Sequence, residues 1–337
     1  MSDIIYNEDR TANWGKLSRN YHQKKKALEI IFKICRAILL FGMCFLIIQP
    51  LLDKLSVSFM SEADLYDSTV VSIPRNFTIG NYYLASKLLN FWKSLTETFF
   101  IVMVSSVLQI AACTLAAYGF ARYKFPFKSF WFFCVMLIIV IPPQTIMASL
   151  YLNFQFFDIF GIFRLIRGEP INLLQDFWGF WLLSATGMGL KSGLYIFMLR
   201  QYFRGMPKEL EEAAWVDGCG KFRTFIQIMV PDASPMLTSC FLFSFVWQWT
   251  DSFFTTLFLS NREMLSKHLG SITEKLTSWW AATNAISGAG IASTAPVGYV
   301  QAMIATGMLM CLAPLIILYL IAQRAFVESL SQTGIKM

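Results

Sequence analysis

The chain has 337 residues, of which 56% are hydrophobic, 16% aromatic and 15% charged, and its formal net charge at pH 7 is +7. Soluble domains carry about a quarter charged residues, so this composition and the mean hydropathy of +0.52 exclude an ordinary soluble fold. The apolar runs are continuous, whereas a membrane β-barrel needs alternating segments of about 10 residues. We therefore expect an all-α polytopic membrane protein.

Six apolar segments approach the roughly 20 residues with which a helix crosses a bilayer. We predict spanning helices, in chain order, at residues 30–52, 98–120, 130–152, 177–199, 234–257 and 300–323. The first is expected to stay uncleaved, because about 30 mostly polar residues precede it and no small-residue cleavage site is evident. Pro142 and Pro143 should break or kink the third helix, and Pro314 should do the same in the sixth.

The distribution of Lys and Arg predicts the orientation. With the N-terminus inside, 18 of these residues fall in the inner segments 1–36, 121–128, 200–231 and 324–337, and 9 fall in the outer segments. The positive-inside rule then places both termini in the cytoplasm. We expect a cytoplasmic segment at 1–29, a transmembrane domain at 30–323 whose loop 201–231 is cytoplasmic, and a cytoplasmic tail at 324–337.

Two features indicate ordinary structural roles. The consecutive Lys24, Lys25 and Lys26 predict a topology anchor that contacts anionic membrane lipid, and nothing else in the chain supports a nucleic-acid partner. The seven cysteines and two histidines show no metal-ligand spacing, so we expect no metal site.

The stretch PKELEEAAWVDGCGKF, residues 207–222, is a charged interruption between the fourth and fifth apolar segments. Pro207 suits the first turn of a helix, and the glutamates that follow favour the positive end of its dipole. Gly218 and Gly220 should end the helix. A second amphipathic segment, 222–230, is expected to end at Pro231. The sequence therefore predicts a short helix outside the membrane.

The spacing in this stretch resembles the EAA loop of binding-protein-dependent ABC importers, which reads EAA, three residues, Gly, nine residues, Ile-x-Leu-Pro. Glu212, Ala213 and Ala214 are followed by three residues and then by Gly218. Nine further residues lead to Ile-Met-Val-Pro at 228–231, with Val in place of Leu.

Other segments are similar to the carbohydrate-uptake subfamily, and within it to the six-helix permease subunit of the maltose type. They lie at 76–82, 116–123, 199–203 and 323–327. The chain departs from that pattern in its longer polar N-terminus, in the loop near 164–175 and in Ser329, where the tail often has Gly. The resemblance covers most of the chain.

The resemblance implies a permease subunit in the cytoplasmic membrane of a bacterium or archaeon, which imports a sugar or oligosaccharide by alternating access. The expected partners are a second permease subunit, a dimer of ATP-binding subunits and an extracytoplasmic solute-binding protein that delivers the saccharide. The EAA helix would dock on the ATPase. The implied coupling residues are Glu212, Ala213, Ala214, Asp217 and Gly218.

This chain is not expected to be an enzyme or to hold a cofactor. The phosphate-binding pattern G-x-x-x-x-G-K-[ST] is absent, because Phe222 follows Gly220 and Lys221. ATP and Mg would be bound by the partner ATPase. Two alternatives stay open: an ABC permease for a solute other than sugar, and a channel or transporter that needs no ATPase.

Polar residues within the apolar segments are candidates for the substrate path, because such residues are costly inside a membrane. Lys191 lies among glycines in the fourth segment, about 13 Å from its inner end, and these glycines would let the helix break and expose backbone to a cavity. Lys191 could line the path and favour a polar or acidic saccharide, it could pair with a partner subunit, or it could be a buried structural lysine. Gln144 follows the two prolines of the third segment and could meet sugar hydroxyls, although the prolines could also serve only to kink the helix.

A last group of candidates lies near the outer end of the fifth segment. The aromatic side chains could contact substrate or could anchor the helix at the interface. Asp251 is expected to face an outer vestibule or the headgroups, and the family's similar stretch here favours a helix-end role. The candidates are Trp247, Gln248, Trp249 and Asp251.

Overall fold

The computed structural model describes the backbone of residues 2–334 except 68, 71–72, 160, 175 and 288–294, and the side chains of residues 25–324 except 27 and the same gaps. Within these residues the regular structure is helical, apart from isolated bridge residues such as Phe157 and Ile171, which form an antiparallel bridge. The chain divides into two units, Met1–Asn76 and Phe77–Met337. The side chains of the predicted tail beyond residue 324 lie outside the described residues.

The first unit contains a long helix and a short one. Helix α1 (Ser2–Ser58) includes the predicted span at 30–52, and its apolar part, Leu28–Ser58, has a mean hydropathy of 2.3 with no residue of its most apolar stretch buried. Helix α2 (Glu62–Tyr66) is capped by Ser61, whose hydroxyl accepts a hydrogen bond from the backbone of Asp64. The Asp64 carboxylate in turn accepts from the backbone and side-chain amides of Asn76, at 2.7 and 2.8 Å. These bonds close the connection that follows α1.

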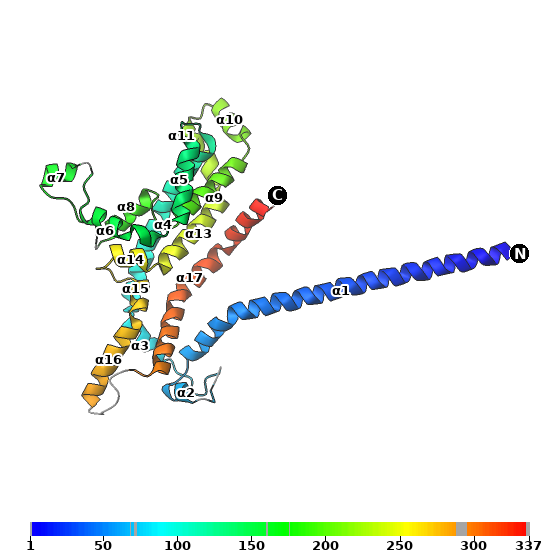
Figure 1. Cartoon of the computed structure of the whole chain (residues 1–337), viewed down its shortest axis with the longest axis horizontal. Helices are drawn as coiled ribbons and strands as arrows, with labels where there is room; N and C mark the ends of the chain where they lie inside the picture. The colour runs from blue at the N-terminus through cyan, green and yellow to red at the C-terminus, as the bar shows by residue number, and fades with distance from the viewer. Residues whose placement is uncertain are drawn as a thin grey trace. The chain divides into compact units, whose positions relative to one another are not determined.

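The second unit contains the remaining helices (Figure 1). Its first half holds α3 (Gly80–Leu88), α4 (Phe91–Arg122), α5 (Lys128–Val140), the 3-10 helix η1 (Pro143–Ile146), α6 (Met147–Gln155), α7 (Ile162–Arg167), α8 (Phe177–Ala185) and α9 (Ser192–Gly205). Its second half holds α10 (Glu209–Val216), α11 (Lys221–Thr224), the π-helix η2 (Phe225–Met229), α12 (Val230–Asp232), α13 (Ser234–Thr250), α14 (Phe253–Phe258), α15 (Leu265–Gly270), α16 (Ile272–Ser287) and α17 (Val297–Gly334).

The described residues contain three to five helical elements that could cross a membrane. Three are single helices, Leu28–Ser58, Phe91–Arg122 and Val297–Arg324, and two are bent pairs, Lys128–Val140 with Pro143–Gln155 and Lys221–Asp232 with Ser234–Thr250. The pairs bend by 101° and 77°. The chain is therefore an all-helical membrane protein. The predicted break in the third segment is confirmed at Pro142, which has an extended backbone and precedes η1.

Two other predicted spans are not continuous helices. The fourth segment is divided into α8 and α9 by the turn at 186–191, and the fifth is divided into α13 and α14 at Asp251 and Ser252. Glycines at 187 and 189 explain the first division, because Gly187 takes φ +70°, which other residues rarely adopt. Conversely, α17 continues through Pro314, so of the predicted break or kink the break does not occur.

Helix α4 is the central element of the second unit. It packs against α8, α9 and α13, and α17 packs against α13 and α3. Small side chains on α4, including Ser105, Ser106 and Cys113, are fully buried, which allows neighbouring helices to approach closely. Helix α9 also lies close to α5, since a Cβ atom on Gly193 would lie 2.8 Å from the carbonyl oxygen of Val135.

A polar cluster joins α15 to α16 and α3. His268 contacts the Glu263 carboxylate through Nε2 and the Lys275 ammonium through Nδ1, and Lys275 also donates to the carbonyl of Leu88 at 3.2 Å. Burial lowers the pKa of His268, and this effect outweighs the opposing influence of Glu263. The neutral imidazole can then accept from Lys275 and donate to Glu263.

Candidate functional site

Helix α10 carries the predicted coupling residues at one end of the second unit, and α16 lies at the opposite end (Figure 1). The helix begins at Glu209, two residues later than the sequence predicts, and it ends as predicted before Gly218. Gly218 has φ +82°, and its N–H donates to the carbonyl of Trp215 at 3.1 Å while the N–H of Cys219 donates to that of Ala214 at 2.9 Å. These two bonds form a Schellman motif, which requires a residue such as glycine in the left-handed conformation. Gly220 does not end this helix but precedes α11.

Most of the predicted coupling residues face solvent. Glu212, Ala213, Asp217 and Gly218 are exposed, whereas Ala214 is buried against the protein. Exposed apolar side chains surround them at the same end of the unit: Leu210, Trp215, Val216 and Phe222. Exposed apolar surface mixed with polar residues is typical of a protein interface.

The neighbouring Glu211 points the other way, into the protein. Its carboxylate accepts a hydrogen bond from the Tyr118 hydroxyl at 2.7 Å and lies 3.4 Å from Arg122 Nε. The side chains of Glu211 and Arg122 are each only 7% exposed. Arg122 Nη2 also donates to the carbonyl of Met206, at 2.9 Å. We call Tyr118, Arg122, Met206 and Glu211 the Glu211 cluster.

This cluster was not predicted from the sequence. Glu211 was expected to favour the helix dipole along with Glu209 and Glu212, and Tyr118 and Arg122 entered only as part of a resemblance. A usable signal was present, because Tyr118 and Arg122 are four residues apart and so share one face of α4 near its end.

A second polar cluster lies inside the helical body and is centred on Gln109 of α4. Gln109 Nε2 donates to Ser192 Oγ at 2.7 Å and to the Leu190 carbonyl at 2.8 Å. Its Oε1 accepts from Ser244 Oγ and from Gln248 Nε2, both at 2.7 Å. Apart from the Leu190 carbonyl, the members are side chains that are at most 2% exposed. We call these five residues the Gln109 cluster; among them only Gln248 was predicted from the sequence as a site residue.

The Gln109 cluster holds the break between α8 and α9, where Lys191 lies. Lys191 has φ +62°, which is rare for a residue with a side chain, and it directly precedes α9. Its ammonium lies 5.1 Å from the centre of the Trp247 ring, and both side chains are exposed. No carboxylate among the described residues lies within ion-pair distance of Lys191. The structure therefore brings Lys191, Trp247 and Gln248 together.

The other predicted path residues do not join this group. Trp249 is buried and donates through Nε1 to the carbonyl of Cys311 at 3.1 Å, which is a packing role. Asp251 lies two residues before α14 begins, and its Oδ2 accepts from the backbone N–H of Thr255 in the first turn of that helix at 3.0 Å. Gln144 is exposed in η1, and among the described residues no hydrogen bond connects it to the Gln109 cluster.

Comparison with known proteins identifies the class. Residues 91–331 match the family described as the binding-protein-dependent transport system inner membrane component. The chain belongs to this family. It is a multi-pass inner-membrane permease subunit of a binding-protein-dependent ABC importer, and the matched component is the transport subunit, without an ATPase domain.

Similar proteins come from both bacteria and archaea. The chain is 30% identical over 193 residues to a probable ABC transporter permease of Pyrococcus horikoshii, covering 56% of this chain and 63% of that protein, which is under two thirds of its length. It is 24% identical to the arabinooligosaccharides transport system permease AraQ of Halalkalibacterium halodurans, over 87% of this chain and 92% of that protein.

A solved structure shares the fold. It is the crystal structure of a bacterial ABC transporter involved in the import of the acidic polysaccharide alginate. The match has a TM-score of 0.64 and 20% identity and covers 88% of this chain and 96% of that one.

Proposed function

We propose that this chain forms half of the translocation pathway of an ATP-driven importer for a sugar or oligosaccharide. The name of the AraQ relative supports a saccharide. The observation that carries the mechanism is α10, a short helix that ends in a Schellman motif and exposes Glu212, Ala213 and Asp217 beside apolar side chains. Such a surface fits docking on a cytoplasmic ATPase, which would bind ATP and Mg. A second permease subunit and an extracytoplasmic binding protein would complete the complex.

The proposed topology has six spans with both termini in the cytoplasm. The bent pair Lys128–Val140 with Pro143–Gln155 would form one span, α13 would form the fifth, and α8 with α9 would form another that is broken at 186–191. Interrupted helices are tolerated at membrane depth where they are buried in protein or line a cavity. Reporter fusions at the C-terminus and in the loop at 261–264 test this topology, and a cytoplasmic signal from the loop fusion would contradict it.

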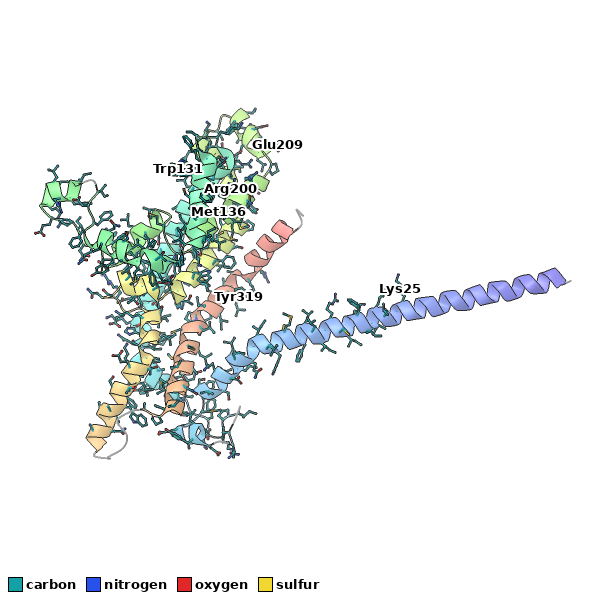
Figure 2. The ribbon with its side chains drawn as sticks, in the orientation of Figure 1. Lys25, Trp131, Met136, Arg200, Glu209 and Tyr319 are labelled. Atoms are coloured by element: carbon teal, nitrogen blue, oxygen red, sulfur yellow. The ribbon has the colours of Figure 1, made fainter. Side chains whose placement is uncertain are left out.

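The coupling role is tested in the complex that purifies with this chain. Glu212→Lys or Gly218→Asp should weaken retention of the ATPase or separate ATP hydrolysis from uptake, while the chain remains in the membrane. Glu209→Lys is the matched control, because Glu209 is an exposed glutamate on the same helix (Figure 2). If no nucleotide-binding subunit copurifies with the unaltered chain, an ATPase-independent transporter becomes the better proposal.

The proposed substrate path runs past Lys191 and Trp247. A charged side chain at membrane depth is costly unless it meets water, a partner or a substrate. The exposed Lys191 has only the Trp247 ring as a described contact, so it is available to a polar or acidic saccharide. Lys191→Met should lower uptake and substrate-stimulated ATP hydrolysis. Unchanged values for both would refute the proposal that Lys191 lines the substrate path.

The saccharide itself is best found through the cognate binding protein. A binding assay with a panel of neutral and acidic oligosaccharides would name it. Selective binding of an amino acid or another non-sugar solute would instead favour an ABC permease for a solute other than sugar. Gln144 stays a path candidate only if it faces the second permease subunit, and cross-linking from that position would show this.

A further inference from the structure

We propose that the Glu211 cluster is the rigid connection through which movement of the coupling helix α10 reaches the membrane helix α4. This inference rests on the proposed function, since it assumes that an ATPase moves α10. It assigns positioning roles to Tyr118, Arg122 and Glu211, which lie behind the docking surface.

The burial of Glu211 distinguishes it from the other glutamates of α10. Glu209 and Glu212 are exposed, whereas Glu211 as a whole residue is only 5% exposed. A buried carboxylate is tolerated only with charged or hydrogen-bonding partners. Tyr118 and Arg122 supply them, and both belong to α4. Glu211 therefore fixes α10 to α4 without using the face that the ATPase would contact.

The cluster also bridges the connection between α9 and α10. Arg122 holds the carbonyl of Met206, which is the residue after α9, so the short segment before α10 is attached to α4 as well. The Tyr118 ring packs against Phe203 of α9 and Phe225 of η2, with ring centres 5.5 and 4.7 Å apart. The ends of α4, α9, α10 and η2 thus meet around Tyr118. Displacement of α10 is therefore passed directly to α4 and is not absorbed by a flexible connection.

Helix α4 continues from this cluster to the proposed substrate path. Tyr118 and Gln109 are nine residues apart on one uninterrupted helix, which is about 13 Å along its axis. Gln109 holds the backbone at Leu190 and the side chain of Ser192 on either side of Lys191. Helix α4 thus carries one hydrogen-bonded cluster at Tyr118 and another at Gln109. A rigid helix of this kind is a contiguous element that can transmit a two-state change.

The test follows the helix break while ATP binds to the purified complex. Met188 lies in the break and is exposed, so Met188→Cys can report on it by maleimide labelling, quantified by mass spectrometry of that peptide. Between the nucleotide-free and ATP-bound complex, the labelling rate should change by about fivefold or more, the lower end of usual coupling between sites. Tyr118→Phe and Glu211→Gln should bring this ratio toward one, while the ATPase still binds and hydrolyses ATP.

Glu209→Gln is the matched control and should keep the full response, because Glu209 is exposed on the same helix. An equal ATP response in Glu211→Gln and Glu209→Gln would overturn the proposed connection. Loss of the assembled complex in both Tyr118→Phe and Glu211→Gln would assign the cluster a folding role and would also overturn it. If the unaltered complex shows no ATP response and no ATP-driven uptake, the proposed function itself fails.

Discussion

Replacing Gln109 by Leu tests whether the Gln109 cluster holds the helices together. The substitution removes all four hydrogen bonds that the Gln109 side chain makes, and it puts an apolar side chain of similar size in the same place. Ser192 keeps its bond to the Gly189 carbonyl, and Gln248 keeps its bond to Ser244. The Ser244 hydroxyl loses the acceptor Gln109, and the Leu190 carbonyl loses its donor.

The expected loss of stability follows from these four bonds. Hydrogen bonds between membrane helices contribute on average about 0.6 kcal/mol each, so their removal costs about 2.4 kcal/mol. The Ser244 hydroxyl and the Leu190 carbonyl lose bonds in a buried setting, so the true value should not be lower. An unfolding entropy of about 2.1 cal/mol/K per residue corresponds to about 1.4 °C per kcal/mol for 337 residues, so the thermal midpoint should fall by about 3 °C.

The assay is thermal unfolding of the purified complex in one detergent at one protein concentration. Gln301→Leu is the matched control, since Gln301 is an exposed glutamine in α17 and should change the midpoint little. Equal midpoints for Gln109→Leu and Gln301→Leu would refute the reasoning that the cluster stabilises the packing of α4 on α13 and on the 186–191 break.

Three further outcomes are expected. Gly218→Val should destabilise the end of α10 by about 1–2 kcal/mol because of its positive φ, and hydrogen exchange at 214–219 should accelerate, whereas Gly220→Ala, in open space at φ −71°, should not have this effect. Gly193→Ala should lower the thermal midpoint, because its Cβ would lie 2.8 Å from the Val135 carbonyl and overpacking costs about 1–3 kcal/mol. His268 has a folded pKa below its unfolded value near 6.5, so its contribution to stability is present above that pH and is lost as the pH falls toward the folded pKa. Hydrogen exchange at 263–276 should therefore rise on acidification, and His268→Gln should remove most of that change.

Apolar composition alone predicted the class of the protein and the approximate position of each apolar segment. These features depend on transfer of side chains from water to lipid, which is a sum over residues and needs no knowledge of neighbours. The break after Pro142 and the end of α10 at Gly218 were also predictable, because proline and glycine act on their own backbone. The glycines around Lys191 also indicated that the fourth segment could break there, whereas the division at Asp251 was not predicted.

The candidate site was only partly predictable. Three adjacent or nearby glutamates look alike in the sequence, and the structure buries Glu211 while it exposes Glu209 and Glu212. Trp247, Gln248 and Trp249 likewise differ by one position each, yet one is exposed, one joins the Gln109 cluster and one packs in the core. Which face a side chain takes depends on the helices that pack around it.

The sequence by itself determined that the chain is a membrane permease with a short helix between its fourth and fifth apolar segments, because spacing and local backbone preferences are written residue by residue. Only the tertiary structure decided that Glu211 joins α10 to α4 and that Gln109 joins α4 to the helix break and to α13. These contacts connect residues 81–139 positions apart. Their partners are selected by burial, where each polar group must find a hydrogen bond within the protein.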